Sequence, residues 1–129
     1  MRDFERSTTV AIGPDEAYRF LAEPANLPRY VATMTRAQPE EGDRLWVAAE
    51  VQGRHEEGNV RFHADVSRRR LEWGAGGPAQ YGGWLQVAAG DGGASVTIHL
   101  HVEHDEDEAE INRALDETVT NINRLLSTT

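Results

Sequence analysis

Histidine is the side chain in this sequence best suited to acid–base chemistry at neutral pH, because its ordinary pKa is about 6.5. The chain has five histidines. Three of them, His63, His99 and His101, alternate with apolar neighbours. Successive side chains of a strand point to opposite faces, so this alternation places all three on the polar, solvent-facing side. His55 and His104 fall in predicted turns. We therefore expect no catalytic histidine.

Metal and cofactor chemistry has little support in the residue pattern. His99 and His101 stand two residues apart, with Glu103 close by. That spacing can share a metal ion, but a wet outer face lacks the enclosing residues that metal sites need. The chain has no cysteine, which excludes disulfides and thiolate ligands. No phosphate loop, dinucleotide fingerprint or nucleophile elbow is present in the sequence. We expect no metal and no cofactor.

The aromatic residues point to binding. Phe62, Trp73 and Tyr81 fall in the apolar phase of their strands, and Tyr30 ends a short helical stretch. Two tyrosines suit a pocket better than a dry core, because each buried hydroxyl needs a hydrogen-bond partner. For any single aromatic residue, a place in the core is the simpler interpretation. The two glycines after Tyr81 can hold a bulge, which leaves its phase relative to Leu85 open.

Two tryptophans and two arginines occupy less expected phases. Trp46 and Trp84 fall on the polar side, where they fit either cross-strand packing or a contact surface, so a homodimer stays open. Arg6 and Arg69 share the phase of inward residues. Because an unpaired buried arginine is costly, we expect both near strand ends with their guanidinium groups in water. Inside a cavity, either would be the best group to hold a ligand carboxylate or enolate.

The elements that position these residues follow from periodicity and proline. Residues 4–12 alternate as a strand. Pro14 suits the first position of a helix, and Pro24 and Pro28 confine the next helical segment to a short turn. From Thr33 a two-residue period runs through about six strands joined by turns rich in glycine and aspartate. Short connections and one polar face are typical of a meandering antiparallel sheet.

The last segment has the period of a helix. An apolar stripe at helical spacing runs over 105–127, with Asp105 placed as its cap and Glu108 as the capping-box partner. At 1.5 Å per residue such a helix reaches about 34 Å, enough to cross a small sheet. A curved sheet wrapped around this helix is the economical way to bury both apolar faces. No linker or repeat is visible, so we expect one domain over 1–129.

The composition limits the classes of partner that the chain is expected to bind. The 129 residues include 22 acidic and 13 basic side chains, for a formal net charge of −9. This charge disfavours nucleic acid and anionic membranes as partners. No apolar stretch is long enough to span a bilayer, and no secretory signal is visible. We expect a cytoplasmic protein without membrane insertion.

Several local phrases carry a resemblance to a known family. They are TVAIGPDEAYRFL at 9–21, PANLPRY at 24–30, RRLEW at 69–73 and GWLQV at 83–87. The chain resembles the START/Bet v 1-like (SRPBCC) helix-grip superfamily, in its bacterial polyketide cyclase/dehydrase and lipid-transport branch, over essentially its whole length. The resemblance implies an α+β helix-grip fold, with a curved seven-strand antiparallel sheet around a long C-terminal helix and two short helices after the first strand.

The resemblance also implies a pocket between the concave face of the sheet and the last helix, used in relatives for apolar small molecules. A curved sheet cannot touch a straight helix along its whole length, which leaves a gap. We expect the chain to bind or carry a small apolar or aromatic molecule there. The residues expected at this site, with the tyrosines orienting and the others filling, are Tyr30, Met34, Phe62, Trp73, Tyr81, Leu85, Leu115 and Val119.

Two other functions stay open. A cyclase or dehydratase acting on a polyketide-like substrate needs an acid–base group beside a developing enolate. Outward histidines leave two tyrosines and two arginines for that part, and an ordinary tyrosine pKa near 10 makes a poor base at neutral pH. An interaction or self-associating module would use the outward tryptophans and the acidic stretch at 103–110. We expect binding without turnover, in a pocket with no histidine and at most one charged side chain.

Overall fold

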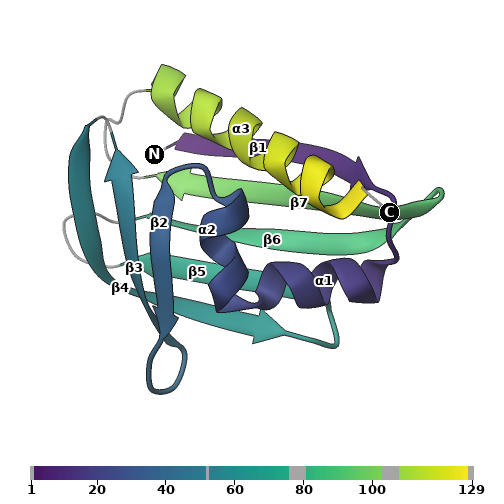
Figure 1. Ribbon diagram of the computed structural model, residues 1–129, viewed down its shortest axis with the longest axis horizontal. Coiled ribbons are helices and arrows are strands. Elements are labelled where there is room, and N and C mark those ends of the chain that lie inside the picture. The colour runs from purple at the N-terminus through teal and green to yellow at the C-terminus, as the bar shows by residue number, and fades with distance from the viewer. Residues whose placement is uncertain (1, 52, 76–80, 103–107, 128–129) are drawn as a thin grey trace.

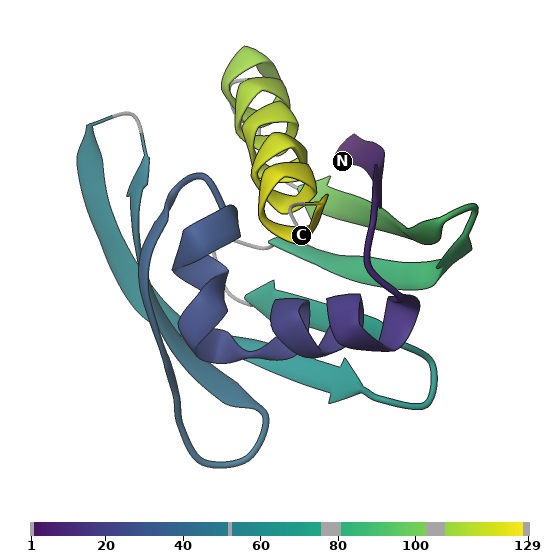
Figure 2. The same ribbon diagram turned by 45° about the vertical axis from the view of Figure 1, so that its right-hand side comes forward.

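A computed structural model describes residues 2–51, 53–75, 81–102 and 108–127. Its strands form one antiparallel sheet in the order β1-β7-β6-β5-β4-β3-β2, and the helices lie on one side of it (Figures 1 and 2). The predicted helix-grip fold is confirmed. The elements are β1 (Arg2–Val10), α1 (Pro14–Ala22), the 3₁₀ turn η1 (Pro24–Asn26), α2 (Leu27–Tyr30), β2 (Met34–Pro39), β3 (Arg44–Val51), β4 (Arg54–Asp65), β5 (Arg70–Ala75), β6 (Tyr81–Gly90), β7 (Gly93–Val102) and α3 (Glu108–Ser127).

The register divides the sheet into an inner face toward the helices and an outer face. Leu71, Leu85 and Ile98 lie opposite one another on β5, β6 and β7, and each is at most 4% exposed. Trp84 and His99, which each adjoin a member of this row in sequence, pair across β6 and β7 on the other face. The strand phase predicted from alternation is therefore confirmed for β5, β6 and β7.

Proline starts each short helical segment after β1. Pro14, Pro24 and Pro28 all occupy first-turn positions, where the missing N–H has no intrahelical partner to lose. At the end of α2, Tyr30 is 2% exposed and its hydroxyl donates to the Leu21 carbonyl at 2.6 Å. This bond satisfies one of the carbonyls left open at the end of α1. It therefore fixes the angle between the two helices.

The long helix α3 lies along β1 and also contacts α2 (Figure 1). Two bonds join it to the segment around α2: the Ala32 N–H donates to Thr118 Oγ1 at 3.0 Å, and Asn121 Nδ2 donates to the Tyr30 carbonyl at 3.2 Å. The predicted cap Asp105 lies outside the described residues. None of the helices in the described part of the chain is long and apolar enough to cross a membrane. The buried stripe of α3 consists of Leu115, Thr118, Ile122 and Leu126.

Replacing Leu115 by aspartate tests this packing. Leu115 is 4% exposed in the apolar core, and a carboxylate buried there without a partner costs several kcal/mol. We expect the free energy of unfolding to fall by about 3–5 kcal/mol of a total of about 5–15. Urea titration followed by circular dichroism measures the loss. Thr120→Asp on the exposed side of α3 is the control, expected to cost less than about 1 kcal/mol. Equal losses from both variants would contradict the packing described.

Candidate binding site on the inner face of the sheet

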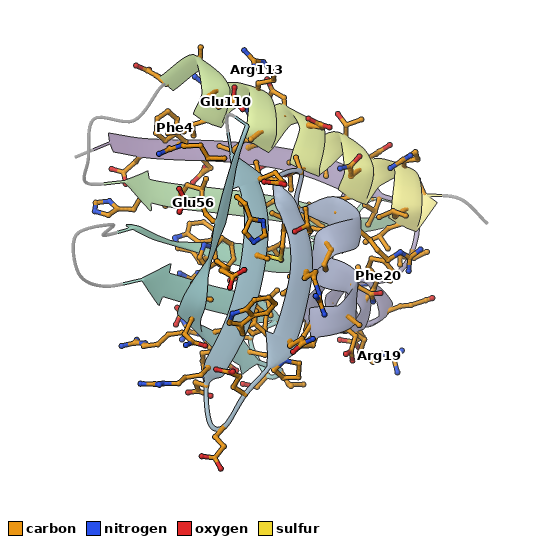
Figure 3. All side chains as sticks on the ribbon, turned by 60° about the vertical axis from the view of Figure 1, so that its left-hand side comes forward. Phe4, Arg19, Phe20, Glu56, Glu110 and Arg113 are labelled. Carbon is orange, nitrogen blue, oxygen red and sulfur yellow. The ribbon has the colours of Figure 1, made fainter. Side chains whose placement is uncertain are left out.

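The helices cover the inner face of the sheet less completely with distance from the β6–β7 turn. Near the β6–β7 turn, α1 lies against both strands, and Val87 and Val96 are almost fully buried. Two rows further along, Phe62, Trp73 and Leu100 pack against the core but stay partly exposed. Figure 3 shows this end of the fold, with Glu110 and Arg113 on the first turns of α3. We define the inner apolar surface as the partly exposed apolar residues of β3, β4, β5 and β7 in the inward phase, which are Val47, Val60, Phe62, Trp73 and Leu100.

The central row of this surface runs across five strands. Phe62 of β4 lies opposite Trp73 of β5, which lies opposite Gly83 of β6, and the row continues through Leu100 of β7 to Phe4 of β1. Phe4 is buried at the edge of the row, close to the first turns of α3 (Figure 3). Three of the five positions are therefore aromatic.

Glycine at position 83 permits a close approach by the indole of Trp73. A Cβ added at this position would lie 2.9 Å from Trp73 Cζ2, 3.0 Å from Trp73 Cε2 and 2.4 Å from the backbone oxygen of His99. These distances are shorter than ordinary carbon contacts. The indole therefore occupies the space that any larger residue at position 83 would fill.

The sequence-predicted site residues lie in two environments. Phe62 and Trp73 belong to the inner apolar surface, and Met34 of β2 and Val119 of α3 are partly buried against the same core. Leu85 and Leu115 are fully covered members of that core. Tyr30 is also buried, with its hydroxyl already donating to Leu21, and burial raises the pKa of Tyr30. The side chain of Tyr81 lies outside the described residues; its backbone keeps an unbroken register with β7 through Leu85, which leaves no bulge between the two.

Three residues of the inner apolar surface were not singled out from the sequence: Val47, Val60 and Leu100. Each shares the inward phase of its strand, which the alternation pattern does show. Phase alone does not tell a covered position from a partly exposed one. That difference depends on where the helices cross the sheet.

Arg6 and Arg69 are engaged by helices. Arg6 Nε donates to Asp116 Oδ1 of α3 at 2.7 Å, and its Nη2 donates to Asn112 Oδ1 at 2.6 Å. Arg69 Nε donates to Asp15 Oδ1 of α1 at 2.7 Å. Their side chains are 32% and 35% exposed. Each guanidinium is therefore held at the rim, between the sheet and a helix. Arg69 lies next to a strand end as expected, but that expectation is wrong for Arg6, which lies in the middle of β1.

His99 and His101 lie on the outer face, as predicted. His99 Nδ1 lies 3.2 Å from Glu5 Oε1, and its Nε2 lies 3.2 Å from Asp3 Oδ1. His101 Nδ1 lies 2.8 Å from the same Asp3 oxygen, and this hydrogen bond holds the pKa of Asp3 below its ordinary value. Among the described residues no group of three or more side chains could hold a metal ion.

The remaining described histidines also lie outside the inner apolar surface. His55 in the β3–β4 hairpin has its Nε2 2.8 Å from Glu57 Oε2, and this bond raises the pKa of His55. His63 Nδ1 lies 3.6 Å from Asp43 Oδ2. His104 lies outside the described residues. The structure also has two polar hollows. One of about 420 Å³ is lined by Glu40, Glu41 and Arg44. The other, of about 360 Å³, is lined by Asp43, Arg61, His63, Glu72 and Gly74 together with Trp73, so Trp73 borders both this hollow and the inner apolar surface.

The two outward tryptophans pack against their neighbours. Trp84 stacks on His99 with ring centroids 5.2 Å apart and an interplanar angle of 5°. The Arg70 guanidinium lies 4.5 Å from the centre of the Trp84 ring, and that of Arg36 lies 5.8 Å from the centre of Trp46. These contacts support the cross-strand packing interpretation. A homodimer through these rings stays a prediction.

A protein-family model matches almost the whole chain. The model described as "Polyketide cyclase / dehydrase and lipid transport" matches residues 1–126. A search of the curated proteins finds no match.

Solved structures with a similar fold match this chain at low sequence identity. The di-domain ARO/CYC BexL from the BE-7585A biosynthetic pathway is 25% identical with a TM-score of 0.72, over 98% of this chain and 45% of its own. This chain therefore spans less than half of BexL. The Zhui aromatase/cyclase from Streptomyces sp. R1128 is 16% identical with a TM-score of 0.77, over 97% and 93% of the two chains. CV1439 from Chromobacterium violaceum is 11% identical with a TM-score of 0.78, over 100% of both. The last two similarities show the fold alone.

A matched pair of tyrosine variants tests the role of Tyr30 in the structure. Tyr30→Phe removes the donor to the Leu21 carbonyl, and we expect it to lower the free energy of unfolding by about 1–2 kcal/mol. The buried hydroxyl of Tyr18 has no hydrogen-bond partner among the described residues, so Tyr18→Phe should be neutral or slightly stabilising. Chemical denaturation of both variants gives the comparison. A neutral Tyr30→Phe would mean that the hydroxyl does not fasten α2 to α1.

Proposed function

This chain belongs to the polyketide cyclase/dehydrase and lipid transport family, and on that premise we propose that it binds a small apolar or aromatic molecule on the inner apolar surface. The observation that carries the proposal is that this surface is apolar and yet partly exposed next to a fully buried core. Concave, mostly apolar surfaces between secondary-structure layers are the usual sites of small-molecule binding.

The chemistry of the surface favours an uncharged ligand. Its five residues have no ionisable group, and Ile111 and Val119 of α3 are also apolar, partly exposed and packed against the same core. A two-ring molecule that buries roughly 200 Å² there gains about 5 kcal/mol from apolar burial. Even in full that gain corresponds to a Kd of only about 0.2 mM, and association entropy takes back part of it, which places the expected affinity in the millimolar range.

A cyclase or dehydratase acting on a polyketide-like substrate is the second candidate. It is favoured by the aromatase/cyclase and ARO/CYC names of two structural relatives. Enolate chemistry needs one group to move a proton and another to stabilise the oxyanion. Arg6 at the rim suits the second task, although its Nε and Nη2 already serve Asp116 and Asn112. No described histidine faces the inner surface to move the proton, and this favours binding without turnover.

A polar substitution on the inner apolar surface tests the proposal. We expect the apolar dye 8-anilinonaphthalene-1-sulfonate to bind the wild type with increased emission. Leu100→Gln should weaken that binding about tenfold, because an amide in apolar surroundings costs about 1–2 kcal/mol. Ser95→Gln, on the outer face of the same strand, should leave the affinity within about twofold. Fluorescence titration measures both.

Thermal melting of the two variants checks that each is folded. Native mass spectrometry of freshly purified wild type tests independently whether a ligand stays bound through purification. No dye binding to the folded wild type, or equal losses in the two variants, would contradict a site on the inner face.

A further inference from the structure

Trp73 forms a floor at the centre of the inner apolar surface. It stands between Phe62 and Gly83 in the central row. Its Cζ2 and Cε2 atoms lie 2.9 and 3.0 Å from the position of a Cβ on Gly83, so the indole extends over the backbone of β6. Trp73 is nevertheless only partly buried. Part of its surface therefore stays accessible, and Trp73 also borders the polar hollow beside His63.

Glycine at position 83 allows the indole of Trp73 to lie directly on the backbone of β6. A Cβ at position 83 would also lie 2.4 Å from the backbone oxygen of His99, so the strand pairing itself requires glycine there. A side chain at this position would push the indole off the backbone and divide the row. With glycine, no side chain stands between Trp73 and Leu100, and two of the four positions from Phe62 to Leu100 are aromatic.

The geometry points to Trp73 as a specificity-determining residue that selects a planar ring system over a flexible chain. This inference rests on the proposed function and assigns its ligand class. Rings that stack on an aromatic side chain gain a preference of about two- to tenfold beyond the apolar area they bury. A flexible chain lying on the same floor gains no stacking and loses rotational freedom.

Two probes of equal carbon number separate shape from hydrophobicity. 2-Naphthol and 1-decanol each have ten carbons and one hydroxyl, but decanol exposes more apolar surface. A site that responds only to apolar area therefore binds decanol more tightly. We expect the wild type to bind 2-naphthol at least about fivefold more tightly than decanol in isothermal titration calorimetry.

Variants of Trp73 test whether this residue causes the preference for 2-naphthol over decanol. Trp73→Leu keeps an apolar side chain without a ring, and should weaken 2-naphthol about fivefold while decanol stays within about twofold. Trp73→Phe, which keeps a smaller ring, should lie between wild type and Trp73→Leu and serves if the leucine variant melts below the assay temperature. Trp84→Leu makes the same change on the outer face of β6 and should alter neither affinity.

The outcomes separate the two proposals. Decanol binding as tightly as 2-naphthol, or equal losses for both probes in Trp73→Leu, would overturn the ring selection and leave the binding function standing. Failure of both probes and of the dye to bind the folded wild type would remove the binding function and the inference with it.

Discussion

The helices on the inner face have to cover a sheet that is much wider than any one of them. The 20 residues of α3 give a rod about 30 Å long and about 10 Å wide. Seven strands at about 4.8 Å spacing extend roughly 29 Å from the first to the last. In the structure α3 lies along β1 at one edge, while α1 covers the turn end of β6 and β7. Apolar surface of the middle strands stays partly exposed, and the candidate site is a consequence of that mismatch.

The helices are held at the perimeter of the inner face. Arg6 joins β1 to Asp116 of α3, and Arg69 joins the sheet to Asp15 of α1. Such partly exposed ion pairs contribute little to stability, but each connects a helix to the sheet. Because the charges are engaged at the rim, the interior row is left to apolar side chains. This division suits a ligand held by area and shape rather than by charge.

Periodicity predicts the order of the elements and the faces of β5, β6 and β7, and the resemblance added the helix-grip fold. The outward phase of His99 and Trp84 and the buried stripe of α3 follow from alternation and helical spacing. The site could be predicted only in part. Tyr30 is inward as expected, yet its hydroxyl is committed to Leu21, a contact set by the angle between α1 and α2. The contact of Trp73 with Gly83 depends on the offset between β5 and β6, which no single-strand pattern contains.

Methyl-resolved NMR of the protein with 2-naphthol tests the central claim, that the partly exposed inner face is the binding site. Intermolecular nuclear Overhauser effects should connect the ring protons to methyl groups of Val60 and Leu100, on the inner apolar surface. Val66, 74% exposed in the β4–β5 turn, should show none. Contacts confined to Val66, or to Asp43, Arg61 and His63 of the polar hollow, would contradict the account.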